Sequence, residues 1–291
     1  MNNAINEINA LAPPGITGEG IGIAILDTGI CPLEDFTFPK NRIIAFKDFV
    51  YGRNTAYDDN GHGTHVAGIA CGNGYLSHKK YVGIAPQSNI ISLKILDELG
   101  HGSSSAALDA IRWIGKNKNT YNIRVVNLSI GTNDKTIASP LIKEVNSLWE
   151  KGVVVVAASG NDERNGIASP GISQKILTVG SIEEQIRFRI KSGNTVYYKP
   201  DVFAPGENII SCKADDFSFQ GKKRSGKSVI DSYYVRMSGT SMATPMISGT
   251  AALILQYSPK LSPDSVKRLI CDAANTSSPE GLLNIEKIFF G

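Results

Sequence analysis

The chain has 291 residues, of which 42% are apolar and 20% charged, so it is long enough to bury a sizeable core. Its net charge of +3 is too small to make nucleic acid or an acidic membrane the main partner. No run of about eighteen apolar residues is present, which excludes a membrane-spanning helix in this sequence.

The first residues and the cysteines bear on the cellular compartment. The N-terminus lacks the basic start and apolar stretch of a signal peptide. The cysteines lie far apart and show no CxxC spacing: Cys31, Cys71, Cys212 and Cys271. This pattern favours free buried thiols in a reducing compartment, although two disulfides stay open as an alternative. We therefore expect a cytoplasmic protein.

Residues 1–19 are polar and contain Pro13 and Pro14, which predicts a short N-terminal arm. No composition shift or linker divides the rest of the chain. We therefore expect one domain over residues 20–291.

An apolar, glycine-containing stretch follows the arm and ends in Asp27 and a turn. It predicts a buried strand with an acid at its carboxyl end, where open α/β sheets place active groups. Gly18, Gly20 and Gly22 imitate a dinucleotide-binding fingerprint. Those glycines must follow a strand and open a helix, whereas these precede a strand, so nucleotide binding is disfavoured here.

Residues 58–68, Asp-Asp-Asn-Gly-His-Gly-Thr-His-Val-Ala-Gly, predict a helix of small residues opened by His62. His62 and His65 form a His-x-x-His pair that raises the question of a metal. A zinc site needs a third ligand, and the pattern His-Glu-x-x-His is absent, so we expect no metal here.

Apolar strands and amphipathic helices then alternate along the chain. The predicted strands are 89–96, 124–128 and 153–158, and the predicted helices are 104–116, 140–151 and 262–274. This alternation predicts one α/β domain with a doubly wound, mostly parallel sheet and helices on both faces.

Residues 237–245, Met-Ser-Gly-Thr-Ser-Met-Ala-Thr-Pro, form a small-residue turn that enters a long apolar helix. Ser241 then lies beside the unpaired N–H groups and the positive end of the helix dipole, where an oxyanion would be held. Taken alone it would be an N-cap residue. With Asp27 and His62 earlier in the chain, however, the order Asp, His, Ser is one known for serine triads.

These three motifs resemble those of the subtilisin-like (S8) serine proteases, over about residues 20–269. Within that family the chain resembles the AprX-type intracellular proteases of Gram-positive bacteria. The stretches that carry this likeness are 57–68, 167–180, 199–211 and 237–269. The resemblance implies a serine endopeptidase with a single-domain subtilisin-like fold.

The resemblance also implies a role for each site residue. Ser241 is the nucleophile, His62 the base and Asp27 the residue that orients the base. Asn161, in the context Ala-Ala-Ser-Gly-Asn, donates to the oxyanion together with the Ser241 N–H. His65 is packed structurally. No cofactor is required, and the partners are protein or peptide substrates.

Two extended edges are expected to hold the substrate backbone as an added strand. They are Gly100, His101 and Gly102 on one side and Ser129, Ile130 and Gly131 on the other. Ala168 falls where family members place the floor of the P1 pocket, and its small size would admit a fairly large uncharged side chain. Without the resemblance, the two glycine segments would be interpreted as turns.

Secreted subtilisins often bind calcium in a loop that corresponds to residues 72–81. In this loop Asn73 is the only good oxygen side chain, and His78, Lys79 and Lys80 follow it. A hard cation needs several oxygen ligands and no positive neighbours, so these residues argue against a structural calcium ion.

Two segments depart from the family pattern. Residues 186–198 alternate around Ser-Gly-Asn and predict a β-hairpin where subtilisins usually carry Phe-Ser-Ser-x-Gly. Residues 213–234 form a basic, insertion-like loop that we interpret as solvated and as a site of self-cleavage. Within it, residues 221–228 formally match the P-loop pattern, but no helical periodicity follows, so nucleotide binding is disfavoured.

These departures leave two alternatives to a broad degradative protease open. One is a processing protease of narrow specificity, and the other is a pseudoprotease that binds peptides. The presence of Asp27, His62, Ser241 and Asn161 argues against the pseudoprotease. The sequence does not predict the oligomeric state.

Overall fold

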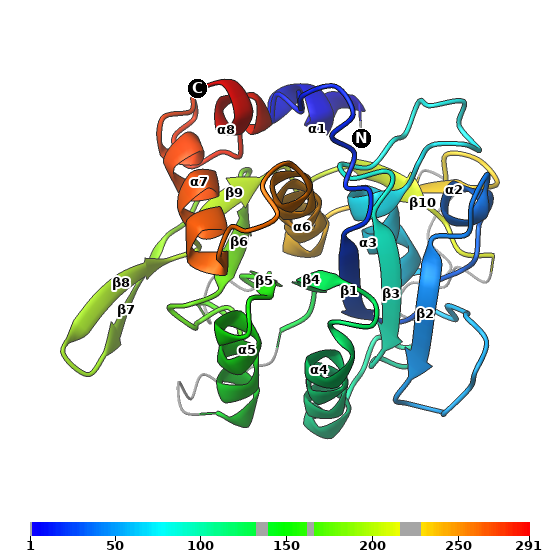
Figure 1. The fold of residues 1–291 in the computed structure, drawn as a ribbon, viewed down its shortest axis with the longest axis horizontal. Coiled ribbons are helices and arrows are strands. Elements are labelled where there is room, and N and C mark those ends of the chain that lie inside the picture. Colours follow the sequence, from blue (N-terminus) through cyan, green and yellow to red (C-terminus); the bar gives the residue numbers. More distant parts are fainter. Residues whose placement is uncertain (1, 132–138, 162–165, 216–227) are drawn as a thin grey trace.

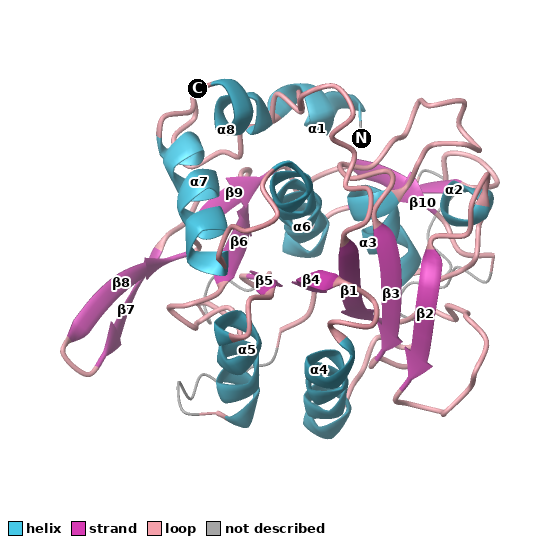
Figure 2. Cartoon of the chain, in the orientation of Figure 1, coloured by secondary structure: helices cyan, strands magenta, loops and turns pink. Residues whose placement is uncertain are grey.

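The structure of the protein, a computed structural model, describes residues 2–131, 139–161, 166–215 and 228–291. Its centre is a seven-stranded sheet in the order β2-β3-β1-β4-β5-β6-β9, in which every neighbouring pair is parallel (Figure 2). The strands are β1 (Gly22–Asp27), β2 (Ile43–Asp48), β3 (Asn89–Lys94), β4 (Ile123–Leu128), β5 (Val154–Ala158), β6 (Leu177–Ser181) and β9 (Val202–Ala204).

Helices pack on both faces of this sheet, which confirms the predicted α/β fold (Figure 1). One face is covered by α4 (Ser104–Asn117) and α5 (Pro140–Glu150). The other carries α3 (His62–Cys71) and α6 (Thr240–Tyr257), which pack against each other, and α7 (Pro263–Asn275). The short helices are α1 (Asn2–Glu7), α2 (Glu34–Thr37) and α8 (Ile285–Phe290).

Helix α6 crosses the centre of the sheet and contacts β1, β4, β5, β6 and β9. Nearly all of its side chains are buried, because most are small or aliphatic and allow the helix to approach its neighbours closely. Gly249 marks one close approach, since a methyl group added there would lie 2.6 Å from the Cβ atom of Ile84. This burial fixes the position of the helix that begins beside Ser241.

The N-terminal arm is packed on the domain. Helix α1 leads to Ile8, whose side chain is fully buried in the main hydrophobic core. The N–H of Ile285, at the start of α8, donates to the carbonyl of Ile8 over 3.0 Å. The two ends of the chain therefore support each other, and they lie together in Figure 1.

Two antiparallel pairs lie outside the main sheet. One is formed by β10 (Ile209–Cys212) and β11 (Tyr234–Met237). The other is the hairpin of β7 (Phe188–Ser192) and β8 (Thr195–Lys199), which projects from the body of the domain (Figure 1) and confirms the predicted hairpin.

The P-loop-like stretch of the sequence lies outside the described residues except for its last residue, and residues 229–233 that follow it form no helix. Within the described part of the chain, no helix combines the length and the apolar character that crossing a bilayer requires.

Candidate active site

Asp27 and His62 meet at the carboxyl edge of the sheet. Asp27 is the last residue of β1 and only 1% exposed, and His62 is the first residue of α3. The Nδ1 atom of His62 lies 2.7 Å from Oδ1 of Asp27. Because an ionised carboxylate only accepts hydrogen bonds, this contact places the proton on Nδ1 and leaves Nε2 able to accept one.

The surroundings of His62 raise its pKa above the ordinary value of 6.5. Burial acts in the opposite direction, because it disfavours the charged imidazolium. The negative charge of Asp27, its hydrogen bond and the charge of Asp58 outweigh burial. The site is therefore built to stabilise a protonated His62.

Asp58 holds the turn that carries His62, a role that the sequence analysis did not predict. Its Oδ1 atom accepts hydrogen bonds from the Thr28 hydroxyl and the Gly61 N–H, each over 2.8 Å. Its Oδ2 atom accepts from the N–H and the hydroxyl of Thr64 over 2.8 Å and 2.6 Å. Asp58 thus connects the turn after β1 to the first turn of α3. Its position four residues before His62 was the available signal.

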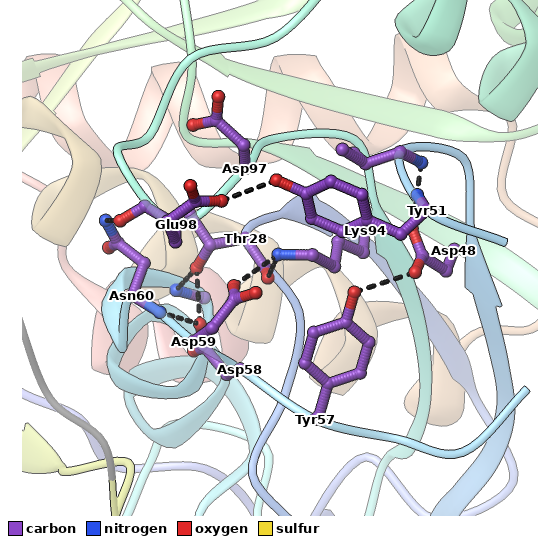
Figure 3. A network of polar contacts seen from close by, with 12 residues as sticks. Thr28, Asp48, Tyr51, Tyr57, Asp58, Asp59, Asn60, Lys94, Asp97 and Glu98 are labelled. Atoms are coloured by element: carbon purple, nitrogen blue, oxygen red, sulfur yellow. Dashed lines mark hydrogen bonds and ion pairs between the residues drawn. The ribbon is translucent and has the colours of Figure 1, made fainter. Parts of the chain in front are cut away.

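Lys94 joins the turn after β1 to the turn before His62, as Figure 3 shows. Its side chain is fully buried at the end of β3, and its Nζ atom donates to the Thr28 carbonyl over 2.7 Å and to Asp59 over 2.6 Å. The ammonium group also lies 5.0 Å from the centroid of the Tyr57 ring. Because a buried cation needs such partners, Lys94 keeps the turn after β1 and the turn before His62 together.

The same turn is tied to one predicted substrate edge. Asn60, two residues before His62, donates from its amide nitrogen to the Glu98 carbonyl over 2.9 Å (Figure 3). The segment that starts at Glu98 leads directly into Gly100. His62 and this edge are therefore positioned by one hydrogen-bond network.

His65 is fully buried and does not line the groove. Its Nε2 atom lies 3.1 Å from the Ile209 carbonyl and 3.2 Å from the Val235 carbonyl, so it joins α3 to the β10–β11 pair. Burial, with a smaller contribution from the charge of His62, lowers the pKa of His65 to about 3. Across the residues that the structure describes, no cluster of three or more His, Cys, Asp and Glu side chains could hold a metal ion.

Ser241 lies in the first turn of α6, directly after Thr240. Its hydroxyl donates to the carbonyl of Ser129 over 2.9 Å, and the hydroxyl of Ser129 donates to the Ser241 carbonyl over 3.0 Å. Ser129 follows the last residue of β4. These two bonds fix Ser241 at the carboxyl edge of the sheet, next to the second predicted substrate edge.

Asn161 follows β5 and is oriented by the same turn. Its Oδ1 atom accepts hydrogen bonds from the N–H and from the hydroxyl of Thr240, each over 2.9 Å. Since the amide oxygen is occupied in this way, the amide nitrogen is the end that remains for donation. Asn161 therefore presents a donor beside the residue that precedes Ser241.

A groove of about 440 Å³ runs along this edge of the sheet. It is lined by His62 and by both predicted substrate segments: Gly100, His101, Gly102, Ser129, Ile130 and Gly131. Apolar side chains also line the groove, among them Leu96, Leu99, Ala107 and Leu141. The structure thus brings His62 and the six edge residues to one groove.

Ala168 does not line this groove, but the next residue, Ser169, does. It packs against Gly131 and Gly160 so closely that a methyl group added to either glycine would lie 2.5 Å or 3.1 Å from its Cβ atom. The N–H of Ala168 donates to the Ser159 carbonyl over 2.8 Å. The loop that contains Ala168 is therefore in direct contact with the edge of the groove.

The loop of residues 72–81 does not fit calcium. The side-chain oxygen of Asn73 accepts a hydrogen bond from the N–H of Tyr75 over 2.9 Å. The backbone carbonyl of Asn73 accepts one from the Lys79 ammonium over 3.0 Å. A lysine cation thus already contacts an oxygen that a metal ion would use. The four cysteines are free thiols, and no disulfide joins any two of them: Cys31, Cys71, Cys212 and Cys271.

The chain is similar to known proteins over most of its length. A model described as "Subtilase family" matches residues 18–286. Serine protease AprX of Bacillus subtilis (strain 168) is 38% identical over 275 residues, which are 88% of this chain and 61% of that protein. Subtilisin Savinase of Lederbergia lenta is 33% identical over 277 residues, which are 93% of this chain and 88% of that protein.

Solved structures show the same relationship. Sphericase superposes with a TM-score of 0.72 at 26% identity, covering 96% of this chain and 91% of that one. A cold adapted subtilisin-like serine proteinase superposes with a TM-score of 0.69 at 29% identity, covering 93% of this chain and 90% of that one.

Proposed function

The chain belongs to the subtilase family of serine endopeptidases, and from this premise we propose that Ser241, His62 and Asp27 hydrolyse peptide bonds through an acyl-enzyme. Catalysis by subtilases needs no cofactor. The observation that carries the assignment is the 2.7 Å contact of His62 and Asp27 beside a groove that also contains Ser129, the partner of Ser241.

The reaction begins when the Ser241 hydroxyl leaves the Ser129 carbonyl and transfers its proton to Nε2 of His62. The Ser241 oxygen then bonds to the scissile carbonyl carbon, and the carbonyl oxygen becomes an oxyanion. Protonated His62 gives the proton to the leaving amine as the carbon–nitrogen bond breaks. Water repeats the sequence on the acyl-enzyme and releases the second product.

Asp27 and Asn161 support the two charges that form. Asp27 keeps His62 in the tautomer that exposes Nε2 and stabilises the imidazolium, in line with the raised pKa of His62. The Asn161 amide and the Ser241 N–H are the donors for the oxyanion, and Thr240 holds the amide in the required orientation.

The substrates in this proposal are proteins or peptides in extended conformation. Their backbone would lie between the segments 100–102 and 129–131, with the P1 side chain directed toward Ala168. We place the reaction in the cytoplasm, which is consistent with four cysteines that remain thiols.

A serine-directed fluorophosphonate probe tests the nucleophile. We expect one label per molecule on the wild-type protein, located on Ser241, and none on the variant Ser241→Ala. The His62→Ala variant should retain no more activity than Ser241→Ala, because the triad acts as a unit. Absence of a label on correctly folded wild-type protein would favour a peptide-binding pseudoprotease.

Hydrolysis of denatured casein tests the reaction itself. Activity should be removed by the fluorophosphonate and unaffected by a chelator of divalent cations. A peptide library then separates broad from narrow specificity, since a single preferred sequence would contradict a general degradative protease.

A further inference from the structure

The hairpin β7–β8 shares a small hydrophobic cluster with the loop that contains Ala168. The buried members are Ile142 of α5 and Ile167 and Ile172 of the loop. Phe188 and Ile190, on one face of β7, pack against them. This cluster is separate from the main hydrophobic core, so its contacts concern the loop and not the domain as a whole.

The two faces of the hairpin differ in exposure. Along β7 half-buried side chains alternate with exposed ones, and β8 follows the same pattern from Val196 onward, as expected for a two-stranded sheet with one covered face. Ile190 and Tyr197 are a cross-strand pair on the covered face, whereas Arg189 and Tyr198 are a pair on the open face. Tyr198 is 58% exposed.

The hairpin also makes a directional contact with the loop. The Tyr197 hydroxyl donates to the Ile172 carbonyl over 2.7 Å. The base of the hairpin is fixed as well, because buried Lys199 donates from Nζ to the Ile176 carbonyl over 2.8 Å and to Asp201 over 2.5 Å. The hairpin is thus anchored at its base and contacts the loop with its covered face.

The loop of residues 167–172 contacts the hairpin on one side and the edge of the groove on the other. Its isoleucines point to the hairpin, whereas Ala168 packs on Gly131 and Gly160. A hydrogen bond of 3.2 Å from the Ile172 N–H to the Ala168 carbonyl connects the two sides of the loop. A displacement of Ile167 or Ile172 therefore moves Ala168 relative to the edge of the groove.

We propose that Phe188 and Tyr197 are positioning residues that set the depth of the P1 pocket, because they press the loop of residues 167–172 against the glycines of the groove edge. The proposal rests on the proposed function, in which Ala168 faces the P1 side chain. A specificity pocket in this protein is then determined by a segment that does not itself line it.

The experiment compares hydrolysis of peptide substrates that differ only in an alanine, leucine or phenylalanine at P1. The variants are Phe188→Ala, which removes packing, and Tyr197→Phe, which removes one hydrogen bond. Tyr198→Phe is the matched control, because it deletes the same hydroxyl one residue away on the exposed face. Rates are divided by the concentration of active sites from fluorophosphonate titration, so that a loss of folded protein cancels.

We expect the kcat/KM ratio of the phenylalanine substrate to the alanine substrate to rise about tenfold in Phe188→Ala and about threefold in Tyr197→Phe. Tyr198→Phe should leave the ratio unchanged. A ratio that is unchanged or lower in both positioning variants, or that rises equally in Tyr198→Phe, overturns the proposal. If Phe188→Ala does not fold, Tyr197→Phe decides alone.

The same experiment separates this inference from the proposed function. Wild-type protein that neither takes the probe nor cleaves any substrate overturns both. Wild-type protein that cleaves the substrates, with P1 ratios insensitive to Phe188 and Tyr197, overturns only the role of the hairpin.

Discussion

Ser129 and Ser241 exchange two hydrogen bonds, and each hydroxyl donates to the backbone carbonyl of the other residue. Pro245 explains one of them. In a regular helix the carbonyl of Ser241 would accept the N–H of the residue four positions later, which here is a proline without an N–H group. The Ser129 hydroxyl supplies the missing donor, so the proline inside α6 is tolerated next to Ser241.

We expect Ser129→Ala to destabilise the protein by about 1 kcal/mol, because the half-buried Ser241 carbonyl loses its donor. Adding Pro245→Ala should recover part of this loss, since alanine provides the N–H that proline lacks. Urea unfolding in a Ser241→Ala background, which prevents self-digestion, measures both effects. A double variant no more stable than Ser129→Ala would contradict the explanation.

The raised pKa of His62 determines the acidic side of the pH profile. His62 must be neutral to accept a proton, so kcat/KM should fall as the pH drops through a midpoint above 6.5. Asp27→Asn removes the charge that opposes burial, so the midpoint should move to lower pH, while kcat falls about 10⁴-fold because the favoured tautomer is lost. A midpoint that stays in place in Asp27→Asn would show that Asp27 does not govern the pKa of His62.

Asn161→Ala should lower kcat by about 10²–10³-fold, or about 3 kcal/mol, with little change in KM, which is the effect known for an oxyanion donor of a subtilisin. Thr240→Val keeps the donor and removes one of the two bonds that orient it, so a loss of about tenfold is expected. Active-site-titrated hydrolysis rates for both variants test the order of these effects. Equal losses in both would assign Asn161 a structural role only.

Lys199 makes the stability depend on pH. Burial lowers its pKa from 10.5 to about 7, despite the opposing charge of Asp201. Between these two pH values the unfolded chain binds more protons, so the contribution of Lys199 to stability rises with pH, by about 1.4 kcal/mol per pH unit for a full proton. In Lys199→Met this contribution to the pH dependence of the free energy of unfolding should be absent. Urea unfolding at pH 7, 8 and 9 in the Ser241→Ala background measures it.

The free energies of unfolding of wild type and Lys199→Met should differ by an amount that changes with pH. A difference that stays constant from pH 7 to pH 9 would contradict the lowered pKa of Lys199. The variant retains a partner for Asp201, because Lys267 lies 3.0 Å from its other oxygen.

The fold was predictable because its signals are local. Strands β1, β3, β4 and β5 and helices α4, α5 and α7 were found within one to two residues, since apolar runs and helical periodicity depend on neighbours in the chain. Three strands of the sheet, β2, β6 and β9, were not predicted. All three are short and are stabilised by pairing with strands that are not their neighbours in a local sequence pattern.

The candidate site was predictable only in its outline. Motifs point to Asp27, His62 and Ser241, but they carry no information on the groups that position these side chains. Lys94 has an ordinary place at the end of an apolar strand, and only the folded chain brings it to Thr28 and Asp59. Such partners are selected by three-dimensional proximity, which sequence spacing does not express.

Helix α6 begins with the turn of Ser241 and crosses five strands of the sheet with nearly every side chain buried. Such a helix belongs to the part of a protein that opens only when the whole molecule unfolds. Loss of the nucleophile by heat should therefore coincide with global melting, without a separate earlier step. An unfolded molecule would lose the proposed peptidase activity, and its exposed chain would become a substrate for the molecules that remain folded.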